Sequence, residues 1–170
     1  FFLSEAAAAI VLEVPSSADL LGEDHGALAW VEETWIGGDG TALIAVDEKT
    51  DTLRRGLKAC LPPAGAAVAF VHAHATGTAH DAFERDAILA VAGERPEIFS
   101  HKGWLGHSLG AAGLVSVALS AQCHGHGRTL TGVPLQEGDR SLTVAQGFGG
   151  HLGVVRMGGK LCWRPPHKVV

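Results

Sequence analysis

The sequence predicts a single α/β domain, and three observations carry this prediction. Segments with the apolar pattern of strands alternate along the chain with segments of helical spacing. Glycine is abundant, with 23 residues, and this favours tight turns and helices packed closely on a sheet. The length of 170 residues suits one domain or half of a larger one, and 46% hydrophobic with 18% charged residues is typical of a soluble globular chain.

Strands, a turn and a helix are expected in the first third of the chain. Residues 6–13 are apolar, and their β-branched end favours a strand. Residues 26–46 alternate as two strands around the turn Gly37-Gly38-Asp39-Gly40. A helix over residues 50–61 follows, and Pro62-Pro63 stops it.

The same alternation continues to the end of the chain. The expected elements are a buried strand at 67–71, a helix at 81–91, a short strand at 97–99, a helix at 108–122 and two strands at 142–144 and 152–157. The helix from Ser108 is strongly apolar and begins with small residues, a pattern typical of a central helix buried between layers. The last two strands flank the glycine turn Gly147-Phe148-Gly149-Gly150.

The net charge limits the possible binding partners, and the cysteine content indicates the redox state of the cellular compartment. The formal net charge of −5, without a basic run, argues against nucleic acid and anionic membranes as partners. We find no apolar run of about 18 residues, so no membrane span is expected. The three cysteines, Cys60, Cys123 and Cys162, are odd in number and irregularly spaced, which indicates a reducing, cytoplasmic setting.

One remote alternative is a serine esterase. Gly106-His107-Ser108-Leu109-Gly110 matches the nucleophile elbow, in which Ser108 would attack an ester carbonyl. Asp139 and His151 follow in the order of a triad. The elbow requires a buried apolar strand before the serine, and residues 100–104 have a poor composition for one.

Two histidine-containing segments could suggest a metal. His72-Ala73-His74 follows an apolar strand, as in some metal-dependent hydrolases, but those barrels need more strands and further ligands. Cys123-His124-Gly125-His126 is explained more simply as a polar loop after a helix. No metal site is predicted.

A third interpretation rests on five motifs in order. They are His74-Ala75-Thr76-Gly77-Thr78, Asp81-x-x-Glu84, Lys102-x-x-x-Gly106-His107, Gly110-Ala111-Ala112-Gly113 and Gly147-Phe148-Gly149-Gly150. Together they resemble the C-terminal half of β-ketoacyl synthases, the condensing enzymes of fatty-acid and polyketide assembly. The opening residues 1–13 are similar to the stretch that begins that half. The resemblance covers residues 1–170 as one domain and implies the thiolase-like fold, layered α-β-α-β-α.

The resemblance implies chain elongation by decarboxylative Claisen condensation. Its catalytic residues would be His74 and His107, which stabilise the oxyanion of a malonyl thioester, with Lys102 beside them as a fixed positive charge. Substrates would be carried on the phosphopantetheine of an acyl carrier protein, and no bound cofactor is implied. Thr76 and Thr78 would face the phosphopantetheine arm.

In the same resemblance, Phe148 and Gly149 of the glycine turn would line the acyl channel. Several positions depart from the family pattern: Ala75 replaces a glycine, Ser116 stands where a glutamate commonly partners the lysine, and Gln146 replaces an aromatic residue. These departures predict an altered charge arrangement around Lys102.

The nucleophilic cysteine of the family belongs to its N-terminal half. None of the three cysteines of this chain lies in a turn of small residues that leads into a helix and activates a thiolate. Two variants therefore remain open within a dimeric condensing complex. The cysteine is supplied by a missing N-terminal half or a full-length ketosynthase subunit, or the chain is a non-catalytic partner like a chain-length factor.

Overall fold

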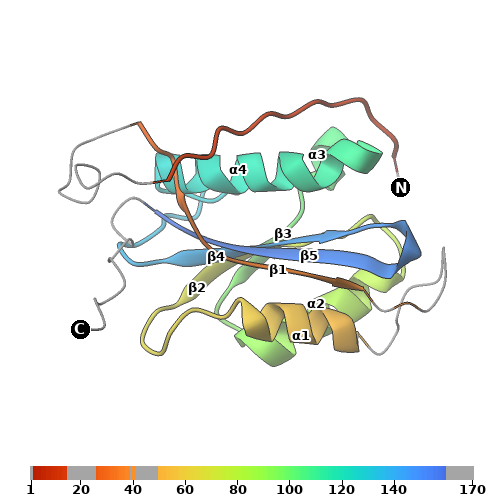
Figure 1. Cartoon of the computed structure of the whole chain (residues 1–170), viewed down its shortest axis with the longest axis horizontal. Helices are drawn as coiled ribbons and strands as arrows, with labels where there is room; N and C mark the ends of the chain where they lie inside the picture. Colours follow the sequence, from red (N-terminus) through yellow and green to blue (C-terminus); the bar gives the residue numbers. More distant parts are fainter. Residues whose placement is uncertain (1, 15–25, 39, 41–49, 160–170) are drawn as a thin grey trace.

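The computed structural model describes residues 2–14, 26–38, 40 and 50–159, and it places one mixed sheet between two layers of helices (Figure 1). The strands are β1 (Trp30–Gly38), β2 (Val68–His72), β3 (Glu97–Phe99), β4 (Arg140–Gln146) and β5 (His151–Gly158). The helices are α1 (Asp51–Ala59), α2 (His80–Ala92), α3 (Lys102–Leu105) and α4 (Ala112–His126), with short 3-10 turns η2 (Leu109–Ala111) and η3 (Phe148–Gly150). The α/β prediction is confirmed.

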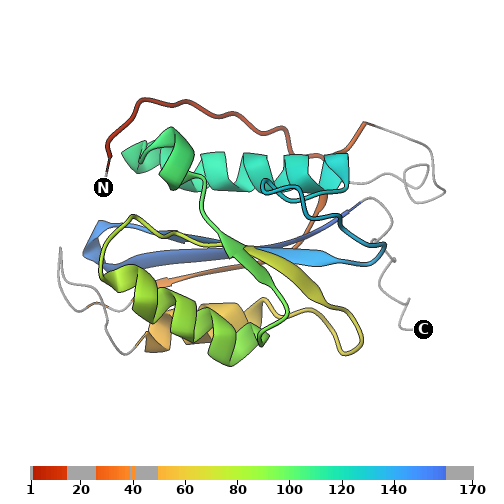
Figure 2. The same ribbon diagram turned by 180° about the vertical axis from the view of Figure 1, so that it is seen from behind.

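The five strands are ordered β1-β5-β4-β2-β3. Strand β2 pairs in parallel with β3 and with β4, whereas β5 runs antiparallel to both β4 and β1. Helices α1 and α2 lie on one face of the sheet and α3 and α4 on the other (Figures 1 and 2). The parallel strands are covered on both faces, which is the usual environment of such strands.

The core between the sheet and the helices α1 and α2 is apolar. Leu57 of α1, Ile88 of α2 and Leu142 of β4 are fully buried there. Helix α1 approaches the sheet at Gly56, where an added Cβ would lie 2.6 Å from the Trp35 ring. Since only glycine allows this contact, part of the predicted close packing is explained at a single position.

The structure has no strand at residues 6–13, so this prediction is wrong. Only the start of the segment pairs with the rest of the chain: Ser4 N donates to His107 O at 3.1 Å and His107 N donates to Phe2 O at 2.7 Å. Further on, Val11 is 85% exposed, and the segment runs along the outer side of α4 (Figure 1). A strand needs a row of backbone partners, and none of the described residues offers one beyond Ser4.

The hairpin predicted at residues 26–46 falls only partly within the described residues. Its first strand is β1, which ends at Gly38 and pairs with β5, over a hundred residues later in the chain. The expected second strand lies outside the described residues. The hairpin of β4 and β5 around the glycine turn is confirmed.

Helix α4 begins later than expected, at Ala112, because Leu109 adopts a positive φ of 49° in η2. Its small residues Ala112, Ser116 and Ser120 are buried against the sheet, whereas Leu114 on another side is partly exposed. Among the described residues, a packed layer therefore covers one face of this helix, not two as predicted.

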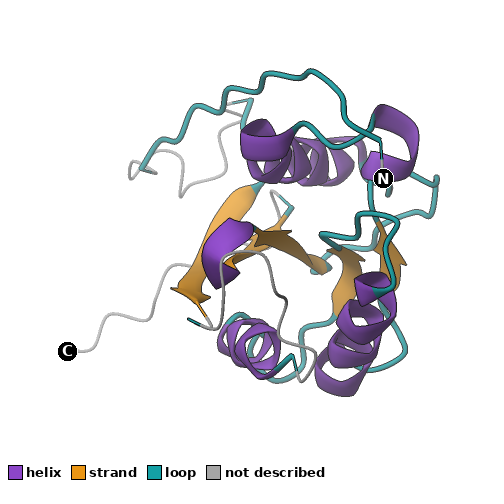
Figure 3. Ribbon diagram, turned by 90° about the vertical axis from the view of Figure 1, so that its right-hand side faces the viewer, coloured by secondary structure: helices purple, strands orange, loops and turns teal. Residues whose placement is uncertain are grey.

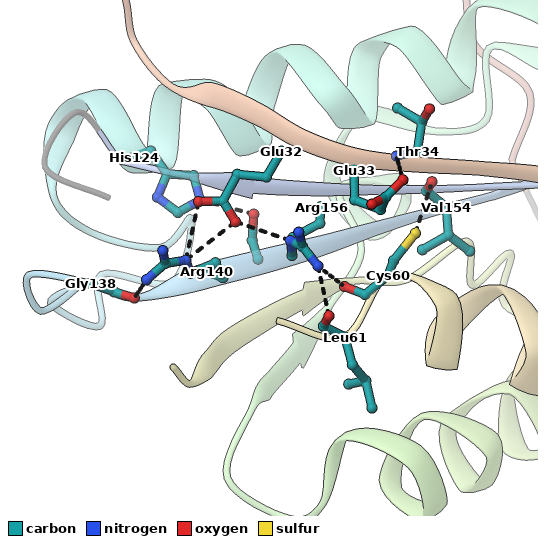
Figure 4. Close-up of polar contacts among 11 residues, drawn as sticks. Glu32, Glu33, Thr34, Cys60, Leu61, His124, Gly138, Arg140, Val154 and Arg156 are labelled. Carbon is teal, nitrogen blue, oxygen red and sulfur yellow. Dashed lines mark hydrogen bonds and ion pairs between the residues drawn. The ribbon is translucent and has the colours of Figure 1, made fainter. Parts of the chain in front are cut away.

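A β-bulge in β1 builds an ion-pair network across the sheet. The pairing of β1 with β5 shifts between Val31 and Glu33, so Glu32 is the extra residue. Its carboxylate accepts from Arg156 Nε at 3.0 Å and from Arg140 Nε at 3.2 Å (Figure 4). Arg156 Nη1 also donates to the carbonyl of Leu61 at 2.6 Å. The network joins β1, β4 and β5 to the end of α1.

Candidate active site

The predicted site residues gather at the edge of the sheet where the parallel strands end. His74 follows β2, Lys102 follows β3, and Gln146 is the last residue of β4. This edge faces the viewer in Figure 3. Polar groups that follow neighbouring parallel strands meet at their carboxyl ends, which is the usual location of sites in α/β sheets.

Two carboxylates hold the loop after β2. Glu84 Oε1 accepts the amide of His74 at 2.7 Å, and Glu84 Oε2 accepts the amide of Ala75 at 2.8 Å. Asp81 accepts the next two amides, those of Thr76 at 3.0 Å and Gly77 at 2.8 Å. The Asp81-x-x-Glu84 motif thus binds four consecutive backbone N–H groups and fixes the loop that carries His74.

The rings of His74 and His107 lie edge to face, with centroids 5.5 Å apart and an interplanar angle of 80°. The backbone N–H of Gln146 donates to His74 Nδ1 at 3.3 Å, and the backbone N–H of Leu109 donates to His107 Nδ1 at 2.9 Å. A neutral imidazole that accepts at Nδ1 carries its proton on Nε2. Both histidines are therefore held as Nε2–H donors.

Both imidazoles are kept uncharged by their surroundings. Burial, followed by the positive charge of Lys102 and by His107, lowers the pKa of His74 to about 3. Burial and Lys102 also lower the pKa of His107 below its usual value. Neutral imidazoles can donate to a developing oxyanion without first losing a proton.

Lys102 is buried, and its ammonium group donates to the carbonyl oxygen of His74. Burial lowers the pKa of Lys102 to about 8, while the carboxylates of Glu84 and Asp81 act in the opposite direction. Lys102 is thus mostly charged at neutral pH. The negative charges that act on this lysine are those of Glu84 and Asp81, since residue 116 is a serine.

The substituted position Ser116 has another role. Its hydroxyl donates to the carbonyl of Ala112 at 3.1 Å and lies 3.4 Å from His101 Nδ1. Sequence reasoning missed that the carboxylates of Glu84 and Asp81 act on the charge of Lys102. The signal was present in the Asp81-x-x-Glu84 motif, but the motif alone does not say where its side chains point.

The four residues predicted to contact substrate lie near the same edge. The hydroxyls of Thr76 and Thr78 are 3.3 Å apart, and Thr78 is exposed. Phe148 begins η3 directly after β4 and is 71% exposed. Gly149 has a φ of 79°, which a residue with a side chain rarely adopts, so the turn requires glycine.

The geometry around Ser108 contradicts the esterase alternative. Helix α3, not a strand, precedes Ser108, so the strand-to-turn-to-helix arrangement of an elbow is absent at this position. Asp139 lies just before β4 and pairs with Arg95. Ser108 follows His107, whose ring packs on His74 beside Gln146 at the other end of that strand. A strand of this length separates the two by roughly 20 Å.

The described residues also contain no group of three or more His, Cys, Asp or Glu side chains that could hold a metal ion. Both ring nitrogens of His72 are engaged, with Ser120 and with His101. Residues 123–126 form the last turn of α4, not a loop as expected, and His124 Nε2 lies 2.9 Å from Ser141 Oγ.

Neither described cysteine resembles an activated nucleophile. Cys60 is buried at the end of α1, where its thiol lies 3.6 Å from the carbonyl of Val154, and burial raises its pKa. Burial raises the pKa of Cys123 to about 11. A catalytic cysteine needs a lowered pKa. Cys162 lies outside the described residues.

The fold is that of the C-terminal half of thiolase-like proteins, and the sequence comparisons give the family. Residues 28–132 match the family model described as "Beta-ketoacyl synthase, C-terminal domain". The chain belongs to the β-ketoacyl synthase family. No helix among the described residues is long and apolar enough to cross a membrane.

Two curated relatives are named 3-oxoacyl-[acyl-carrier-protein] synthase 2, from Mycobacterium bovis and Mycobacterium tuberculosis. Each is 33% identical over 125 residues, which cover 71% of this chain and 30% of the relative. A relative of the same name from Mycobacterium leprae is 32% identical. The matched region therefore spans less than a third of the length of these relatives.

Solved structures share the fold. The ishigamide ketosynthase/chain length factor matches with a TM-score of 0.62 and 25% identity, covering 78% of this chain and 38% of the other. A β-ketoacyl synthase from Burkholderia phymatum matches with a TM-score of 0.65 and 22% identity over the same shares. A ketosynthase in complex with a type II acyl-carrier protein matches with a TM-score of 0.64 and 20% identity.

Proposed function

We propose that this chain supplies the histidine half of a decarboxylative condensation site that elongates acyl chains in fatty-acid or polyketide assembly. The observation that carries the proposal is the pair His74 and His107, with ring centroids 5.5 Å apart and both held neutral as Nε2–H donors. Lys102 lies beside them, bonded to the His74 carbonyl. The substrates are acyl and malonyl groups carried on the phosphopantetheine of an acyl carrier protein.

The proposed step breaks one carbon–carbon bond and forms another. The malonyl thioester loses carbon dioxide, and the electron pair of the broken bond passes to the α-carbon and the thioester oxygen. His74 and His107 stabilise this enolate by donating from Nε2. The α-carbon then attacks an acyl thioester on a cysteine, and the cysteine leaves as a thiolate. Fixed donors of this kind typically contribute about 3 kcal/mol each.

The remaining site residues would position the substrate and supply a positive charge near its reacting thioester. Lys102 keeps a positive charge near the developing oxyanion and anchors the His74 backbone. Thr76 and Thr78 offer hydroxyls to the amides of the phosphopantetheine arm. Phe148 and Gly149, in the turn after β4, border the acyl channel.

The nucleophilic cysteine has to come from elsewhere. Cys60 and Cys123 are buried with raised pKa values, and the matched region spans 30% of the curated relatives. We therefore propose that residues 1–170 form one C-terminal-type domain, completed by an N-terminal half or by a full ketosynthase subunit within a dimer. The apolar residues exposed beside the site, such as Trp104 and Leu109, support such a covering.

A second candidate is a non-catalytic partner that shapes the acyl tunnel of a full synthase, as a chain-length factor does. The similarity to the ishigamide ketosynthase/chain length factor favours it, as does the lack of an activated thiol among the described cysteines. In that role Phe148 limits the length of the acyl chain, and the histidines do no chemistry.

Decarboxylation of malonyl-carrier protein separates the two candidates. The assay contains the chain together with the protein that supplies the cysteine. For the condensation site, His74→Ala and His107→Ala should each lower the rate by about 100-fold or more. His126→Ala, at an exposed histidine of α4, is the matched control. Unchanged rates in the two site variants, together with altered product length in Phe148→Ala, would leave the tunnel-shaping role.

A further inference from the structure

A line of hydrogen-bonded side chains crosses the interior behind the candidate active site. Thr143 Oγ1 of β4 donates to Ser120 Oγ of α4 at 2.9 Å. Ser120 Oγ lies 3.0 Å from His72 Nδ1 at the end of β2. His72 Nε2 lies 2.9 Å from His101 Nδ1, on the residue just before α3. The line joins three strand or helix elements to the segment that carries Lys102.

The protons in this line can be assigned. The backbone N–H of His101 lies 3.3 Å from His72 Nε2 and donates to it, so this nitrogen is an acceptor. His101 Nδ1–H is then the second donor to the same nitrogen, and His72 Nδ1–H donates to Ser120. His72 and His101 are 0% and 1% exposed, so both rings are held neutral inside the protein.

This arrangement is not explained by stability. His101 Nε2 is buried and has no hydrogen-bond partner among the described residues. An unsatisfied buried polar group destabilises a fold, and apolar side chains of similar shape often serve at least as well as a buried polar pair. Two histidines in these positions therefore call for a role other than packing.

The placement of the pair relative to the site suggests that role. His72 is two residues before His74, and His101 is one residue before Lys102. The bond between the two imidazoles and the bond from the Lys102 ammonium to the His74 carbonyl connect the same two segments. Ser100 Oγ adds a third connection by donating to the carbonyl of Ala75 at 3.2 Å.

We propose that His72 and His101 are a positioning pair, whose imidazole-to-imidazole hydrogen bond sets the place of Lys102 relative to His74. The kinetic consequence rests on the proposed condensation chemistry, whereas the placement of Lys102 does not. Without this bond, one of the three side-chain connections between the end of β2 and the start of α3 is lost, and the ammonium is held less firmly. Displacements of about 1 Å at a catalytic centre can lower rates by about 100-fold.

Amide side chains of different lengths separate this role from simple packing. Glutamine places its amide where His72 has Nε2, and asparagine places its amide where His72 has Nδ1. His72→Gln therefore keeps the bond to His101 and loses the bond to Ser120, whereas His72→Asn does the reverse. His72→Asn loses the two contacts at Nε2, with the Nδ1 and the backbone N–H of His101, and His72→Gln loses the one contact at Nδ1. A purely structural role therefore predicts that activity falls in proportion to stability in both variants. His101→Asn against His101→Leu is a second matched pair.

The first measurement is the titration of Lys102, followed by the NMR shift of its labelled ε-carbon in the 170-residue chain. In His72→Gln and His101→Asn, the pKa of Lys102 should stay depressed near its starting value of about 8. In His72→Asn and His101→Leu it should rise toward that of an exposed lysine, because the ammonium gains access to water. An unchanged titration in both of these variants would overturn the proposal.

The second measurement is malonyl-carrier decarboxylation by the complete complex. His72→Asn should lower kcat by about tenfold or more with little change in KM, while His72→Gln retains most of the rate. Equal losses in His72→Asn and His72→Gln would contradict the positioning role. If the rate is also unaffected by His74→Ala and His107→Ala, the condensation chemistry fails, and the Lys102 titration still decides the positioning pair.

Discussion

The carboxylate of Glu84 holds the backbone of His74 in place, with Oε1 accepting its amide at 2.7 Å while Oε2 accepts the amide of Ala75. Glu84 is 1% exposed, and burial raises its pKa, whereas the two backbone amides and the charge of Lys102 act in the opposite direction. One buried acid thus serves both the loop that carries a candidate catalytic histidine and the lysine beside it. This relationship explains why the Asp81-x-x-Glu84 motif accompanies His74 in the sequence.

Replacing Glu84 by glutamine should destabilise the chain by about 2 kcal/mol, because one of the two amides then faces an NH₂ group and Lys102 loses one of the two carboxylates that act on it. The measurement is urea unfolding followed by circular dichroism. Asp86→Asn, at an exposed position of the same helix, removes the same charge and should change stability by less than about 0.5 kcal/mol. Equal effects of the two changes would refute the structural role of Glu84.

Stability should fall as the pH is lowered below about 6.5. Burial is the main cause that lowers the pKa of His72 to about 3 and that of His101 to about 4, from 6.5 in the unfolded chain. The unfolded chain therefore binds protons that the folded chain does not, so stability is complete above the unfolded pKa and is lost on acidification. Each of the two histidines should contribute about 2 kcal/mol of this loss between pH 7 and pH 5.

Urea unfolding at several pH values tests this expectation. The double variant His72→Gln with His101→Asn lacks both groups and should show a weaker dependence on pH between about 7 and 5. His126→Asn, at an exposed histidine, should leave the dependence unchanged. A pH dependence that stays the same in the double variant would show that other groups control acid unfolding.

The ion-pair network of Glu32 should contribute measurably to the sheet. Glu32→Gln leaves Arg140 and Arg156, both mostly buried, without their shared carboxylate. We expect a loss of about 2 kcal/mol, reduced from the value for a fully buried pair because the three side chains retain some exposure. Glu33→Gln, at the exposed neighbouring residue, is the control and should have little effect. Similar unfolding midpoints in the two variants would contradict a stabilising network.

The two buried thiols should react slowly. Burial raises the pKa of Cys123 to about 11 and raises that of Cys60, so little thiolate is present near pH 8. Alkylation of the folded chain by iodoacetamide, followed peptide by peptide by mass spectrometry, should be roughly 100-fold slower at these residues than after unfolding. Rapid labelling of either thiol in the folded chain would reopen the question of a nucleophile within the described residues.

Most of the helix and strand bounds that could be predicted follow from the local pattern of apolar residues. The elements β2, α2, β3 and β5 were expected within one or two residues, because periodicity and Gly or Pro stops act over short distances. The strand expected at residues 6–13 failed because a strand also needs a partner, which periodicity does not report. The pairing of β1 with β5 was missed for the same reason, since it joins residues far apart in the sequence.

The sequence by itself determined the family, because five motifs in order are a property of the chain alone, and it named the histidines and the lysine of the candidate site. Only the tertiary structure decided how these groups are held. The Nε2–H state of His74 depends on the amide of Gln146, the negative charges that act on Lys102 are those of Glu84 and Asp81, and His72 lies within hydrogen-bond distance of His101. These contacts join separate strands and helices, so hydrogen-bond geometry and burial decide them once the sheet has formed.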